Sequence, residues 1–221
     1  MNTKLMLRAG LTLCAAFALS GCLKGTGLQG SLAEVVYDSI TEVGEFENET
    51  TTMPTSGTAS YTGSALIQMA DSATDANQRV MAGEATLDAR FSAAGGAVSG
   101  SLQNFVGAKD VDMQAFNAAI YTGTVADIET QLADFSPVDG TIDVTADSST
   151  GERFTVGFSG TLTQDGDTIE VGGTGAGQFV GADADGGKGY GGTTLNGFGT
   201  QSTLSENGSA QEGQIYINAT K

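Results

Sequence analysis

The residue best suited to covalent chemistry is Cys22, which closes the first apolar run of the chain in the stretch Leu19-Ser20-Gly21-Cys22. A thiol reacts as its thiolate, so Cys22 can accept a diacylglyceryl group through a thioether bond. The small residues Ser20 and Gly21 let the preceding backbone lie in the groove of a peptidase. This spacing indicates a cleavage site followed directly by a lipid-bearing cysteine.

The segment before Cys22 has the organisation of a signal peptide. Lys4 and Arg8 form a positive n-region, and no charged residue stands between Ala9 and Leu19. That run is shorter than the roughly 20 residues of a membrane span, but it has the length of an h-region of about 7–15 residues. Its end resembles the bacterial lipobox. The alternative is an ordinary secretory signal that merely contains cysteines.

The lipobox resemblance divides the chain into three parts. We predict a lipoprotein signal peptide over 1–21, a lipid anchor with a tether and short helix over 22–57, and a barrel domain over 58–221. The resemblance also implies acylation of the freed amine, and several acyl chains together anchor a protein stably. Leu23, in place of Asp, resembles lipoproteins sent to the outer membrane of bacteria with two membranes.

Composition excludes several functions. The chain has 26 acidic and 9 basic side chains, a net charge of −17, no histidine, and only the cysteines Cys14 and Cys22. Such a surface repels nucleic acid, which we exclude as a partner. With Cys14 removed and Cys22 acylated, no disulfide is possible and no free thiol or imidazole remains for catalysis. We therefore predict no enzyme activity, no catalytic residue and no cofactor.

Two acidic loops are candidates for metal sites. Asp183 and Asp185 before Gly186 resemble the start of a calcium loop, but Gly192 stands where an EF-hand needs Glu. We predict a flexible glycine loop over 181–192 and no metal. Asp165 and Asp167 flank Gly166, which an Asp-Gly hairpin turn explains.

Alternating apolar and polar residues dominate from residue 58 onward. We expect the apolar positions to face a common core: Tyr61, Ala65, Ile67, Met69, Ala85, Leu87, Ala89, Phe91, Ile142, Val144, Ala146, Phe154, Val156, Phe158, Leu162, Ile169 and Val171. We count three strands before residue 112 and five after residue 135, the seventh over 191–200. The fold predicted is mainly β, an eight-stranded antiparallel barrel, with a two-sheet sandwich as the alternative. A transmembrane barrel would need an outward apolar band, whereas one face of most strands is polar.

Helical spacing occurs in two places. Leu32, Val36 and Val43 predict a short N-terminal helix over 32–43. One or two helices are expected over 112–135, after the third strand, with Thr124 and Asp127 capping the second. We expect this insert to cover an open end of the barrel.

The order of these parts resembles the transferrin-binding protein B family and its small single-barrel relatives in Gram-negative bacteria. The resemblance covers roughly residues 56–200. It rests on "SGTASYTG" at 56–63, on the strand and turn from Ala89 to Leu102, and on Gly177 to Ala182 followed by Gly186-Gly187. Val180 and Ala182 replace the usual Tyr and Pro. The larger family members capture host transferrin, but no position here matches their binding residues.

The resemblance implies an outer-membrane lipoprotein whose barrel binds an extracellular or periplasmic partner, in a role linked to iron or nutrient acquisition. Two alternatives remain open at this point. One is a lipocalin-like carrier of a small apolar ligand, which Phe91, Phe154, Phe158 and Leu162 would exclude by filling the barrel. The other is a structural envelope lipoprotein without a soluble ligand.

Overall fold

The computed structural model describes residues 27–221 except 50, 73, 94, 148–150 and 195–199. The predicted signal peptide and Cys22 therefore lie outside the described residues. The elements in chain order are α1 (Gly27–Phe46), β1 (Ser56–Ala70), β2 (Asn77–Ser92), β3 (Gly95–Asp112), α2 (Met113–Thr122), α3 (Val125–Leu132), β4 (Ser136–Asp147), β5 (Arg153–Gln164), β6 (Asp167–Val180), the 3-10 turn η1 (Ala182–Ala184), β7 (Gly186–Gly192), β8 (Ser202–Glu206) and β9 (Ser209–Thr220).

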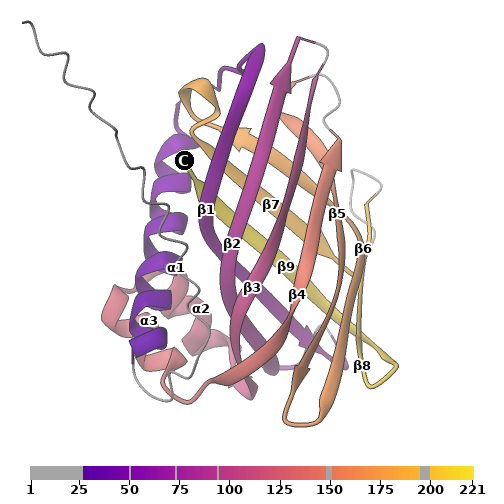
Figure 1. The fold of residues 1–221 in the computed structure, drawn as a ribbon. Helices are drawn as coiled ribbons and strands as arrows, with labels where there is room; N and C mark the ends of the chain where they lie inside the picture. The colour runs from indigo at the N-terminus through magenta and orange to yellow at the C-terminus, as the bar shows by residue number, and fades with distance from the viewer. Residues whose placement is uncertain (1–26, 50, 73, 94, 148–150, 195–199) are drawn as a thin grey trace, which may run out of the picture.

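The strands form one closed antiparallel barrel (Figure 1). Each strand from β1 to β6 pairs with the next along the chain, and β9 closes the sheet by pairing with β1. Both β7 and β8 pair with β6 on one side and β9 on the other, so together they occupy a single interrupted position. The barrel thus has eight strand positions. The eight-stranded antiparallel barrel is confirmed, and the sandwich alternative is wrong.

Two local predictions between β6 and β9 need correction. Half of the glycine loop expected over 181–192 is the strand β7, which starts at Gly186, while Ala182–Ala184 form η1. The seventh strand expected over 191–200 is instead the pair β7 and β8, and its residues 195–199 lie outside the described part. Both predictions took glycine-rich composition as a sign of a loop. A glycine-rich segment can form a strand when it pairs with a strand on each side, as β7 does with β6 and β9.

The barrel interior is filled by apolar side chains. Alternate residues of every long strand point inward and form one buried cluster, as the sequence pattern predicted. Phe91, Phe158 and Leu162 are buried in it, and Phe154 packs against it partly buried. The Phe179 ring packs between two others, with its centroid 5.4 Å from that of Phe91 and 5.0 Å from that of Phe154. The interior is therefore a packed core.

The helices pack against the outside of the barrel wall (Figure 1). Leu66, Val80 and Val106 on β1, β2 and β3 point outward and would be exposed without this cover. They contact the apolar faces of the helices, which are formed by Leu32, Ala33, Val36, Phe116, Ile120, Ile128 and Leu132. The expectation that the insert covers an open barrel end is therefore wrong. Burial of these outward residues is the physical reason for the position of the helices.

The helix boundaries follow their capping residues. The helix expected over 32–43 is the longer α1. The insert forms two helices: Asp112 caps α2, and Thr124 with Asp127 forms the predicted capping box of α3. Among the described residues, no helix has both the length and the apolar character needed to cross a membrane.

We predict opposite effects of adding a methyl group at two glycines. On Gly63 a Cβ would lie 2.1 Å from the carbonyl oxygen of Asn218 on the adjacent strand, so Gly63→Ala should destabilise by about 1–3 kcal/mol. On Gly44 in α1 a Cβ meets nothing within 4 Å, so Gly44→Ala should stabilise by about 0.5–1 kcal/mol. Denaturant unfolding measures both. Equal effects at the two sites would contradict the register of β1 with β9.

Candidate functional site

A polar network replaces the apolar core at one end of the barrel, here called the Arg79 end. On β2, β5 and β8 the last inward apolar residues are Met81, Leu162 and Leu204. The next inward positions on the same strands are Arg79, Gln164 and Glu206. Arg79 has a side chain only 3% exposed, and it donates to Gln164 at 2.7 Å, Asp167 at 2.6 Å and Glu206 at 2.8 Å. The guanidinium thereby links β2 to strands that are not its neighbours.

Further contacts satisfy the partners of Arg79. Lys109 lies 2.5 Å from Asp167 and 3.3 Å from Glu206, which balances the two carboxylates against two cations. Gln164 donates to the carbonyl oxygen of Gly107 at 2.6 Å and to Ser136 at 2.8 Å. Breaking a buried ion pair of this kind costs about 3–5 kcal/mol because the remaining charge loses its partner. The network therefore links strands across this end of the barrel.

The acidic loops that were candidate metal sites have structural roles. Asp165 and Gly166 have φ values of 53° and 92°, which confirms the tight Asp-Gly hairpin between β5 and β6. Asp167 belongs to the Arg79 network. Asp185 pairs with Lys221 at 3.2 Å. Within the described ranges no three His, Cys, Asp or Glu side chains are grouped so that they could hold a metal ion.

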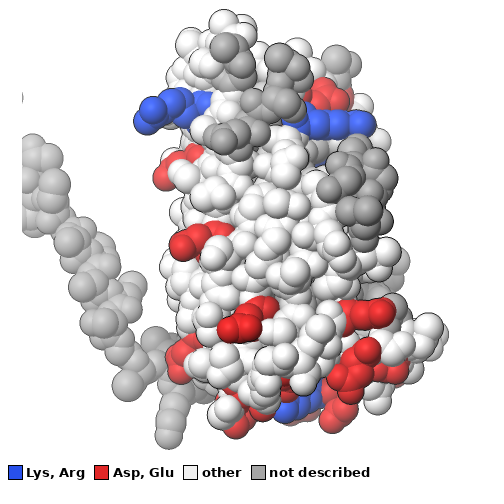
Figure 2. Space-filling view, turned by 90° about the vertical axis from the view of Figure 1, so that its right-hand side faces the viewer, with Lys and Arg blue, Asp and Glu red and all other residues white. Residues whose placement is uncertain are grey.

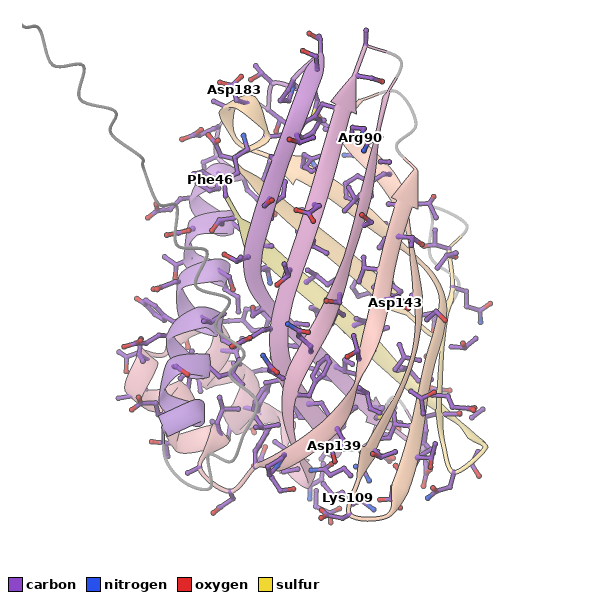
Figure 3. All side chains as sticks on the ribbon, in the orientation of Figure 1. Phe46, Arg90, Lys109, Asp139, Asp143 and Asp183 are labelled. Carbon is purple, nitrogen blue, oxygen red and sulfur yellow. The ribbon has the colours of Figure 1, made fainter. Side chains whose placement is uncertain are left out.

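The opposite end, here called the Phe46 end, carries the turn η1 beside β1 (Figure 3). Tyr61 donates to the carbonyl oxygen of Ala184 at 2.7 Å, and burial raises the pKa of its hydroxyl far above the usual value. The ring of Phe46 packs over Gly181 and Gly186, and the backbone N–H of Lys221 donates to the carbonyl oxygen of Asp185 at 3.0 Å. Both the end of α1 and the end of β9 therefore meet at this turn.

A groove of about 580 Å³ lies on the outer wall near the Phe46 end. Three residues from each of β5, β6, β7 and β9 line it, together with Thr200: Arg153, Phe154, Thr155, Ala176, Gly177, Gln178, Lys188, Gly189, Tyr190, Tyr216, Ile217 and Asn218. Strand pairing arranges these twelve residues in three rows that cross the strands. β7 and β9 pass behind β2 to β4 in Figure 1.

The three rows give the groove its shape. The middle row is Phe154, Gly177, Gly189 and Ile217, whose side chains, where present, point into the barrel, so its outer side is bare backbone. One flanking row holds Arg153, Gln178, Lys188 and Asn218. The other holds Thr155, Ala176, Tyr190 and Tyr216. Two outward rows on either side of a bare row leave a channel that runs across the strands.

Three tyrosines gather at one side of this groove. The rings of Tyr190 and Tyr216 have centroids 5.4 Å apart at an interplanar angle of 52°. The pKa of Tyr216 is raised to about 12, mainly by burial and to a lesser extent by the neighbouring Tyr121 and Tyr190. Tyr121, at the end of α2, is 57% exposed. Tyr190 and Tyr216, which line the groove, are half-buried. Each offers an apolar ring with a polar hydroxyl, a combination enriched where proteins bind partners.

Charged side chains are unevenly distributed over the surface. On the face shown in Figure 2, acidic side chains gather mainly toward the lower end, which is the Arg79 end. Among the described residues, the groove lining includes Arg153 and Lys188 and no carboxylate. This site was not predicted from the sequence. The alternation of polar and aromatic residues around Gly177, Gly189 and Ile217 was visible, but which strands bring these segments together was not.

No protein-family model matches the chain, and no curated protein matches it. The resemblance to the transferrin-binding protein B family therefore stays a prediction. The lipidation of Cys22 also stays a prediction, because that residue lies outside the described part of the chain.

We predict that the Arg79 network makes stability depend on acid pH. Hydrogen bonds from Lys109, Asn207 and Arg79 hold the pKa of Asp167 well below its usual range. A carboxyl group with a lowered folded pKa contributes stability that is full above its unfolded pKa of about 3.9 and is lost as the pH falls further. The free energy of unfolding should therefore fall below about pH 4, and Asp167→Asn should flatten that fall.

The matched control for this measurement is Asp143→Asn, at an exposed position on the outer wall of β4. Denaturant unfolding between pH 7 and pH 2 should show the flattened profile for Asp167→Asn alone. A profile for Asp167→Asn parallel to that of the parent would contradict the role assigned to this carboxylate.

Proposed function

We propose that this protein is a lipid-anchored binding protein of the outer membrane that recognises its partner with the groove over β5, β6, β7 and β9. The observation that carries the proposal is the contrast between the two faces of the barrel wall. The interior is filled with apolar side chains, whereas the outer wall has a channel with tyrosines, amides and cations. This arrangement supports recognition on the outside of the barrel.

The filled interior weighs against the lipocalin-like alternative. A carrier of that kind needs a cavity, and the positions that would line it hold buried Phe91, Phe158 and Leu162. The absence of histidine from the whole chain, and of carboxylates from the described lining of the groove, weighs against acid–base catalysis. Binding without chemistry is the function that fits these residues best.

For a barrel anchored through Cys22, the position of α1 supports one orientation. α1 packs its first half against α3 near the Arg79 end and reaches η1 with Phe46. Cys22 precedes its first residue by five positions, so acyl chains on Cys22 would lie within about 20 Å of that residue, even with the chain extended. The membrane would then face the Arg79 end, and the groove would lie toward the end pointing away from it.

We predict that Cys22 alone attaches the protein to the membrane. Cys22→Ala should move the protein from the membrane fraction to the water-extractable fraction, because no acyl chain can be added. Cys14→Ala is the matched control and should leave the protein in the membrane fraction. Immunoblotting of the fractions measures both, and an unchanged membrane fraction for Cys22→Ala would refute the anchor.

We also predict that partner capture depends on the groove. A chain lacking residues 1–22 keeps every described residue and can serve as bait in envelope extracts, with the captured material identified by mass spectrometry. Tyr190→Ala should reduce capture about tenfold or more, the effect of an aromatic hot spot at 1.4 kcal/mol or above. Thr161→Ala, exposed elsewhere on β5, should not. Equal capture by both variants would remove the groove from the proposed function.

A further inference from the structure

Two cations line the groove of this strongly acidic protein. Its described lining includes Arg153 and Lys188 and no carboxylate, although the chain has 26 acidic and 9 basic residues. We propose that the groove binds an acidic oligosaccharide, with its sugar rings against the tyrosines and its carboxylate or sulfate groups on the two cations. This inference rests on the proposed function and names the class of ligand.

The polar row matches an extended ligand that lies across the strands. Strand register places Arg153 beside Gln178, Gln178 beside Lys188, and Lys188 beside Asn218. Adjacent strands are about 4.8 Å apart, so the row spans roughly 14 Å. Amide groups both donate and accept hydrogen bonds, as sugar hydroxyls require, and Arg holds a carboxylate with paired N–H groups. The two cations alternate with the two amides along this row.

The tyrosine row supplies the apolar part of the site. Tyr190 and Tyr216 occupy the same two strands as Lys188 and Asn218, two residues away on each strand. Their rings can cover the C–H face of a sugar ring whose hydroxyls reach the amides of the other row. The bare backbone of Gly177 and Gly189 lets the ligand lie deep between the two rows.

The acid that pairs with Lys188 must give way to the ligand. Glu47, just beyond α1, pairs with Lys188, and the two side chains are 43% and 38% exposed. Exposed ion pairs contribute about 0–1 kcal/mol, so a ligand carboxylate can replace Glu47 at little cost. The wider negative surface is screened beyond about 8 Å at physiological salt, whereas Arg153 and Lys188 act at contact.

The dimensions favour an oligosaccharide over a protein partner. A groove of about 580 Å³ has the size of a small-ligand site, for which the usual range is roughly 300–1,000 Å³. A stable protein interface buries about 800 Å² on each side. A protein held in this groove would need further contacts beyond the three rows.

The test uses the chain lacking residues 1–22 on an array of uronate-bearing, sialylated, sulfated and matched neutral glycans. The best acidic glycan and its neutral counterpart are then titrated by calorimetry. We expect the acidic form to bind about tenfold or more tightly, as a charge-assisted hydrogen bond allows. Arg153→Gln and Lys188→Gln should remove that preference, and Tyr190→Ala should weaken both ligands. Arg90→Gln, an exposed strand arginine outside the groove lining, is the matched control and should change neither.

The outcomes separate this inference from the proposed function. Binding of no glycan on the array, or equal binding of acidic and neutral forms, would overturn the inference. If a protein is then captured in a way that Tyr190→Ala abolishes, the groove is still a binding site and the proposed function stands. If acidic glycans bind but all four variants bind them like the parent, the glycans bind elsewhere on the protein. The groove assignment is then wrong.

Discussion

Closure of the sheet between β1 and β9 is the constraint on which the rest of the structure depends. Nine residues of β1, from Thr62 to Ala70, pair with Thr220 to Glu212 of β9. Because β9 also pairs with β7 and β8, it fixes both pieces of the interrupted strand position at once. Closure removes the sheet edges and gives every strand one inward face, which the apolar half of the alternating pattern fills.

Closure also creates two ends, and each is sealed by different chemistry. At the Arg79 end a buried guanidinium joins strands across the barrel, so the seal depends on charge and weakens in acid. At the Phe46 end the turn η1 packs Ala184 against the core, and the Tyr61 hydroxyl donates to the carbonyl oxygen of Ala184. The outer wall is not uniform either. Helices cover its apolar part over β1 to β3, and the serines Ser39 and Ser64 meet at 2.6 Å beneath α1.

Strand alternation could be predicted from the sequence because it is a local property. Ile142, Val144 and Phe158 face the core as expected, since period-two spacing sends alternate residues to one side. The position of the helical insert could not be predicted in the same way. It depends on Leu66, Val80 and Val106 forming one outward patch, and these residues come together only after three strands have paired in register.

The same limit applies to the candidate site. Cys22 can be singled out by its neighbours in the chain, whereas the groove exists only through the register of four strands. Lys188 and Asn218 are 30 positions apart in the sequence and adjacent in the barrel. Nothing local marks Gly189 as part of a groove, because its contribution is the absence of a side chain between two rows that other strands complete.

The central claim is that recognition occurs on the outer wall while the interior remains a packed core. Methyl NMR of the protein with a bound partner tests this most directly, because Thr155 and Ala176 report on the groove and Ile67, Leu162 and Ile169 report on the interior. The account predicts that binding shifts the Thr155 and Ala176 signals and leaves the interior signals in place. Shifts confined to the interior methyls would contradict it and would mean that the core opens to admit a ligand.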